Sequence, residues 1–160
     1  MEQNKYLKLH SFLRMGAALL AIIVFISMFI TKQIVHSEFD SVFLEWTGAF
    51  FGEDAFKPTV LGFIGYIFVI LGGLAGLAFV FIDEIIGEDL TKKLSFVVGG
   101  VMVLGGVFML LTGVMFRAIN SDGMGIKYYH LAAGPIVFAI LAILAGLMNA
   151  AAPILEDKGL

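Results

Sequence analysis

Two things are scarce in this chain: cysteine, which is absent, and charge, which is sparse. The lack of cysteine excludes disulfide bonds, thiolate metal sites and a cysteine nucleophile. Charged residues make up 14% of the 160 residues and hydrophobic residues 60%, whereas a soluble domain averages about 25% and about 45–50%. The net charge of −3 is too small to indicate a nucleic-acid partner. Composition therefore predicts a protein surrounded by membrane lipid.

Charge is missing altogether from four long segments. The uncharged runs cover residues 15–31, 58–82, 94–116 and 131–155. Each is long enough, or nearly so, to cross about 30 Å of hydrocarbon as a helix rising about 1.5 Å per residue. We therefore expect an all-α fold, a single domain over residues 1–160 that forms an integral membrane four-helix bundle. Its transmembrane helices are predicted at residues 12–31, 58–82, 94–116 and 131–152.

The predicted spans lack ionisable side chains at their middles. Ion paths, proton relays and coupling sites inside a membrane usually depend on such groups, and no catalytic motif stands in their place. We therefore expect a protein that is not an enzyme, with no catalytic, cofactor-binding or metal-binding residues. A transport path within one chain is disfavoured for the same reason.

The orientation in the membrane follows from the basic residues. Four spans place both termini on one side, and the side richer in Lys and Arg is expected to be cytoplasmic. Six basic residues fall on the side of the termini and second connection, namely Lys5, Lys8, Arg14, Lys92, Lys93 and Lys158, and four on the other, namely Lys32, Lys57, Arg117 and Lys127. We expect a plasma-membrane protein with both termini in the cytoplasm.

The first connection between spans is the one with room for structure of its own. Its apolar residues recur at helical spacing: Phe39, Val42, Phe43, Trp46 and Phe50. This pattern predicts an amphipathic helix over residues 37–51, in the first extracytoplasmic loop, with Ser37 as its N-cap. Phe39, Phe43 and Trp46 would form one aromatic face, a candidate partner surface. Two alternatives stay open: the face caps the protein's own bundle, or it lies on the outer leaflet.

Glycine is abundant and regularly spaced inside the spans. Because lipid tails are as apolar as leucine, helices in a bilayer associate where small residues let backbones approach closely. The predicted helix-packing residues are Gly65, Gly72 and Gly76 in the second span, Gly99, Gly106 and Gly113 in the third, and Ala142 and Gly146 in the fourth. The seven-residue intervals predict that the second and third spans pack together. Some of these residues could instead face a partner protein or a second copy of the chain.

Histidine offers one further possibility. His36 and His130 both fall on the predicted outer side, one just after the first span and one at the start of the fourth. Two histidines from different helices of a bundle can ligate a haem, so a haem-binding electron carrier is a weak alternative. Haem ligands normally lie deeper in the bundle, and no cofactor is expected.

In plan, four spans with a longer first outer loop are similar to claudin-like tetraspan proteins. The outer loop of that family carries a Trp-Gly-Leu-Trp-type motif and two cysteines, and this chain has no cysteine. The similarity is therefore one of layout and assigns no residue a role.

Taken together, these features favour a non-enzymatic membrane protein that works by association. We expect an accessory or scaffold subunit of a larger membrane complex, with membrane lipid and other membrane protein subunits, or further copies of itself, as partners. The alternative from a different class is a small-solute pore or permease component that gains its pathway by oligomerising.

Overall fold

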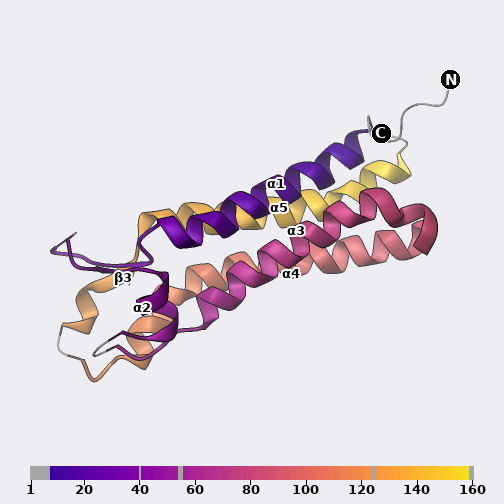
Figure 1. Cartoon of the computed structure of the whole chain (residues 1–160). Helices are drawn as coiled ribbons and strands as arrows, with labels where there is room; N and C mark the ends of the chain where they lie inside the picture. Colours follow the sequence, from indigo (N-terminus) through magenta and orange to yellow (C-terminus); the bar gives the residue numbers. More distant parts are fainter. Residues whose placement is uncertain (1–7, 40, 54–55, 124, 159–160) are drawn as a thin grey trace.

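The computed structural model describes residues 8–39, 41–53, 56–123 and 125–158. Four long helices lie side by side, as the sequence predicts: α1 (Leu9–Ile30), α3 (Leu61–Ile86), α4 (Glu88–Ile119) and α5 (Ala133–Asp157) (Figure 1). All four contain a stretch long and apolar enough to cross a membrane. The all-α four-helix bundle is confirmed, and the chain is an integral membrane protein. Lys5, counted above among the basic residues, lies outside the described residues.

The four helices form a ring in which each packs against two neighbours. α3 lies between α1 and α4, and α5 completes the ring between α4 and α1. The start of α1, the end of α5 and the junction of α3 with α4 share one end of the bundle, which we call the terminal end (Figure 1). The other two connections meet at the opposite end. We call this the sheet end, because the two connections form a small β-sheet there.

The junction at the terminal end is shorter than the sequence suggests. Residues 83–93 read as a polar loop, but α3 continues to Ile86 and α4 begins at Glu88. The chain reverses at Gly87, whose φ of 88° lies in the region that favours glycine. The charged residues there extend the helices beyond the apolar stretch, and Lys92 pairs with Glu88 and with Asp157 of α5.

The first connection forms a β-hairpin and a short helix, so the helix predicted over residues 37–51 is wrong in extent. Strand β1 (Ile34–His36) pairs antiparallel with β2 (Phe43–Leu44), and helix α2 covers only Trp46–Phe51. Ser37 is not an N-cap, since its backbone N–H donates to the carbonyl of Tyr128 at 2.7 Å. Pairing with a distant segment thus overrides the local helical spacing of the apolar residues.

That distant segment is β3 (Tyr129–Leu131), which follows a 3₁₀ turn at Ile126–Tyr128. The strand order is β2-β1-β3, so β1 lies at the centre of the sheet. Because β3 occupies residues 129–131, the fourth span starts at Ala133 instead of residue 131. Asn120 also joins the two connections: its Oδ1 accepts from the N–H of Lys57 at 2.6 Å, and its Nδ2 donates to the Lys57 carbonyl at 3.3 Å.

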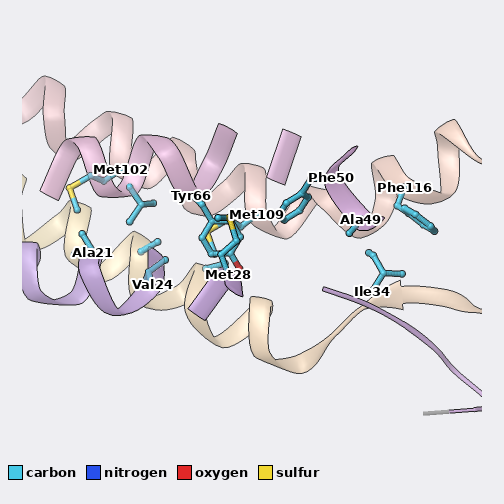
Figure 2. Packing of buried hydrophobic residues seen from close by; sticks show 14 of the residues in the cluster. Ala21, Val24, Met28, Ile34, Ala49, Phe50, Tyr66, Met102, Met109 and Phe116 are labelled. Atoms are coloured by element: carbon cyan, nitrogen blue, oxygen red, sulfur yellow. The ribbon is translucent and has the colours of Figure 1, made fainter. Parts of the chain in front are cut away.

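The core runs the length of the bundle and continues under the sheet. Figure 2 shows its buried side chains, from Ala21 and Met102 in the bundle to Ile34 and Phe116 near the sheet. Met102 and Met109 are almost fully enclosed, which suits the flexible thioether side chain of methionine to the irregular gaps between helices. The bundle interior is thus filled by side chains.

Candidate functional site

The glycines of the spans lie where backbones approach most closely. A Cβ on Gly65 of α3 would lie 2.5 Å from the carbonyl oxygen of Gly105 of α4, and one on Gly105 would lie 2.7 Å from that of Gly65. Gly99 of α4 and Gly146 of α5 stand in the same reciprocal relation, at 2.6 and 2.7 Å. Real Cβ atoms do not approach oxygen this closely, so α4 is held against both neighbours by paired glycines.

The second and third spans pack together as predicted, but not through the stripe of Gly99, Gly106 and Gly113, which faces away from the second span. A Cβ on Gly106 would meet the Ala139 carbonyl and the Ile143 side chain of α5, and one on Gly113 would meet Leu131 of β3. The second span meets α4 at Gly105 instead. A helix in a ring has two neighbours and therefore carries two packing stripes. The seven-residue spacing identifies such a stripe, but it does not show which neighbouring helix the stripe packs against.

The remaining predicted packing residues also point inward. A Cβ on Gly72 would meet Met102 of α4, and one on Gly76 would lie 2.6 to 2.8 Å from the side-chain amide of Asn149 on α5. All eight residues named for packing are buried within the single chain: Gly65, Gly72, Gly76, Gly99, Gly106, Gly113, Ala142 and Gly146. Each is therefore occupied in packing inside the chain.

The three aromatic residues proposed as one partner surface do not share a helix face. Trp46 is half-buried and packs edge-on against Phe29 of α1, with ring centroids 5.2 Å apart. Phe43 lies on β2, with the Nζ of Lys32 4.1 Å from its ring centroid. Phe39 precedes β2 and stacks on His36 at 5.4 Å. Trp46 thus serves the bundle, and only the other two remain as surface residues.

The exposed apolar residues of the hairpin form a different surface. Phe39 is 58% exposed, Val42 43% and Phe43 37%. We call these three residues the hairpin tip. Alternation along β2 explains part of the pattern, because Leu44 faces the core and its neighbour Phe43 faces away from it. The hairpin projects beyond the ends of the long helices (Figure 1), so the tip lies outside the layer of the spans.

The two histidines come close in the sheet but point apart. β1 and β3 pair with Val35 opposite His130 and His36 opposite Tyr129. Directly opposed residues share a face of an antiparallel sheet and adjacent residues alternate, so the imidazoles of His36 and His130 lie on opposite faces. They do not converge on one ligand, which argues against the haem alternative. Among the described residues no group of three or more His, Asp or Glu side chains gathers to hold a metal ion.

A charged contact that the sequence reading missed lies inside the terminal end. Arg14 of α1 is only 1% exposed, and its Nη2 lies 3.3 Å from Glu156 of α5 and 3.4 Å from the hydroxyl of Ser95 on α4. Arg14 and Glu156 each stand near the end of a predicted span, and adjacent antiparallel helices bring those ends to one level. The contact was therefore predictable only with the knowledge that α1 and α5 are neighbours.

Polar groups deeper in the bundle are few and differ in how they are satisfied. The hydroxyl of Tyr66 donates to the side chain of Gln33 at 3.4 Å, and that of Thr112 donates within its own helix to Phe108 at 3.0 Å. Asn149 is fully buried, with its Nδ2 4.0 Å from the sulfur of Met102. Its Oδ1 meets no donor among the described residues. Asn149 is thus a polar side chain held in an apolar core.

Comparison with known proteins gives no guide to these features. No family model matches the chain, and neither a curated protein nor a solved structure matches it. The functional conclusions below therefore rest on the geometry of the chain itself.

Proposed function

We propose that this chain is a non-enzymatic membrane protein that acts by association, as an accessory or scaffold subunit of a larger membrane complex. The observation that carries the proposal is the hairpin tip. Phe39, Val42 and Phe43 expose apolar surface beyond the ends of the spans (Figure 1), where lipid tails do not cover it. Apolar patches of this kind, rimmed by polar residues, mark sites where proteins meet.

The surroundings of the tip favour a protein partner over the membrane surface. Glu38 lies beside Phe39, and Glu45 follows β2; both are exposed. Exposed carboxylates give this hairpin no electrostatic attraction to anionic lipid headgroups. The same carboxylates suit the polar rim that surrounds an apolar contact between proteins.

The small residues of the spans, which were the other candidate interface, are occupied by packing within the chain. The eight small residues considered for association in the membrane are all buried within the same chain. What remains on the outside of the spans is large and apolar, for example Leu19, Leu104 and Leu144. These side chains match lipid tails, and they give no support to an oligomeric pore, which would need polar residues on a shared face.

We also propose that the termini are cytoplasmic and that the membrane is the plasma membrane. Five of the six basic residues assigned to the terminal end are within the described residues, and the sheet end carries four. The larger basic group is expected inside. The hairpin tip would then face the extracytoplasmic side, where its partner would have to present a domain or loop.

The proposal is tested by comparing two serine variants during purification. Tagged protein is expressed in the membranes of its own organism and purified in mild detergent, and co-purifying proteins are quantified. The tip variant carries Phe39→Ser with Val42→Ser, and the control carries Val60→Ser, a similar change at an exposed valine of the sheet end. Buried aromatic anchors concentrate interface energy, and about 1.4 kcal/mol corresponds to a tenfold change in affinity.

Proteins enriched with the parent and the control should fall about tenfold with the tip variant, while thermal melting stays the same. Equal recovery with all three forms would contradict the proposal. Two differently tagged copies of the chain, recovered together only when both carry an intact tip, would identify the partner as a second copy.

A further inference from the structure

A cavity of about 510 Å³ opens at the sheet end, where α1 ends and α5 begins. Its walls include Thr31 and Lys32 from the end of α1, Val35 and His130 from the sheet, and Ala133 and Gly134 from the first turn of α5. Gly134 lets the first turn of α5 lie close to Thr31, because a Cβ on it would be 3.2 Å from the Thr31 side chain. Lys32, His130 and Ala133 are exposed, so the cavity is accessible from the surroundings.

The ionisable side chains on the cavity wall are both basic. Lys32 and His130 are the ionisable groups on its wall, and no acid is among the described residues that line it. The Nδ1 of His130 lies 3.5 Å from the carbonyl of Tyr128, and Nε2 is the other ring nitrogen, which donates to an anion when it carries a proton. The start of α5 and the end of α1 both reach the cavity, and their helix dipoles are opposite in sign, so the basic character of the wall comes from Lys32 and His130. The cavity is suited to an anion.

The position of the cavity narrows the choice of anion. It lies at the ends of two membrane-spanning helices, which is the level of the lipid headgroups. Exposed apolar surface continues from the cavity along both helices. Ile30, the last residue of α1, is 76% exposed, and Val137, one turn beyond Ala133 in α5, is 53% exposed. Basic side chains at the headgroup level above apolar helix faces are how pockets between spans hold anionic lipids.

We propose that this cavity binds the phosphodiester headgroup of a membrane phospholipid, held by Lys32 and His130, with the acyl chains lying along the exposed faces of α1 and α5. The site adjoins the hairpin tip, but lipid binding is measured without a partner protein, so it can fail or succeed independently of the function proposed above. Lys32 also contacts the ring of Phe43, which places the headgroup one side chain away from the tip.

The experiment is native mass spectrometry of delipidated protein titrated with dioleoyl phosphatidylglycerol. The double variant Lys32→Gln with His130→Gln removes both basic side chains of the cavity wall, and Lys57→Gln removes a basic side chain at the same end that is not on the wall. The parent and Lys57→Gln should bind one lipid with equal affinity, and the double variant should bind about tenfold more weakly, since the charge-assisted hydrogen bond of Lys32 and the contact of His130 are both lost. Equal binding by all three forms would overturn the proposal.

Two further arms identify what is recognised. A galactosyl diacylglycerol with the same acyl chains lacks phosphate and should not compete with phosphatidylglycerol. Equal binding of the two lipids would mean that the protein does not recognise the phosphate. Glycerol phosphate without acyl chains should bind far more weakly than the lipid, and equal binding would replace the lipid with a soluble phosphate. Ala133→Phe fills the cavity and keeps Lys32 and His130. It should also lose the lipid, and it decides the question if the double variant does not fold.

Discussion

Gly65 and Gly105 hold the backbones of α3 and α4 so close that neither position admits a side chain. A Cβ on Gly65 would lie 2.5 Å from the Gly105 carbonyl oxygen, and the reverse contact would be 2.7 Å. Both atoms met are backbone, so they cannot move aside as a flexible side chain does. The seam between these helices therefore depends on two glycines at one crossing.

Substitution at this crossing should separate the helices. Gly105→Ala is expected to lower the free energy of unfolding by about 1–3 kcal/mol, the usual range for overpacking a close-packed core. Gly100→Ala in the same helix is the control, because a Cβ there would have no described atom within 4 Å. Alanine is also the better helix former, so this variant should match or exceed the parent. Unfolding by detergent titration, followed by circular dichroism, compares the two; equal losses would contradict a specific seam.

Gly76 and Asn149 should behave as a coupled pair. Gly76→Ala places a Cβ 2.6 to 2.8 Å from the side-chain amide of Asn149, so the single variant should be destabilised. In an Asn149→Ala background the amide is gone, and the same change should cost much less. The coupling energy from the double-mutant cycle is expected at about 1 kcal/mol or more, within the range for residues in contact. Additive effects would show that the two positions do not meet.

The contact of Arg14 with Glu156 should matter more than an exposed ion pair. Glu156→Ala leaves a guanidinium that is 1% exposed without its carboxylate, and losing one partner of a buried pair costs about 3 kcal/mol. The control is Asp122→Ala, which removes the exposed partner of Lys57 at the sheet end and should cost under about 1 kcal/mol. Similar losses for the two variants, in the same unfolding measurement, would contradict a buried role for Arg14.

The spans could be predicted from the sequence because lipid imposes a single requirement on each of them. An uncharged stretch of sufficient length satisfies it, whatever its neighbours are. The ends of the helices are less constrained, since water accepts both helix and loop there. For this reason Gly87 alone replaces the predicted loop at residues 83–93, and α5 starts two residues late.

The hairpin could not be predicted because its partner is far away in the chain. Phe39, Phe43 and Trp46 have helical spacing in the sequence. However, β1 pairs with β3, with His36 opposite Tyr129, and this pairing holds the connection as a hairpin. The same limit applies to the packing residues. Spacing identified Gly106 as a packing position, but only the order of helices in the ring places it against α5. Local spacing thus identified packing positions within the spans, and the pairing of distant segments decided what each position meets.

The orientation can be tested with single cysteines, because the chain has none of its own. Ser121→Cys at the sheet end and Lys93→Cys at the terminal end both replace exposed residues. An impermeant maleimide added to intact cells should label the first and not the second, since the larger basic group is expected inside. The reverse labelling pattern would show that the orientation is inverted and that the hairpin tip lies on the cytoplasmic side.

Association through the hairpin tip is tested most directly by photocrosslinking in the native membrane. A benzoylphenylalanine replaces Val42 at the tip, and in a second protein it replaces Asp122, which is exposed at the same end but outside the tip. Illumination of intact membranes should join the Val42 form to a discrete protein and leave the Asp122 form without that adduct. An adduct with lipid alone at Val42, or the same protein adduct at both positions, would contradict association through the tip.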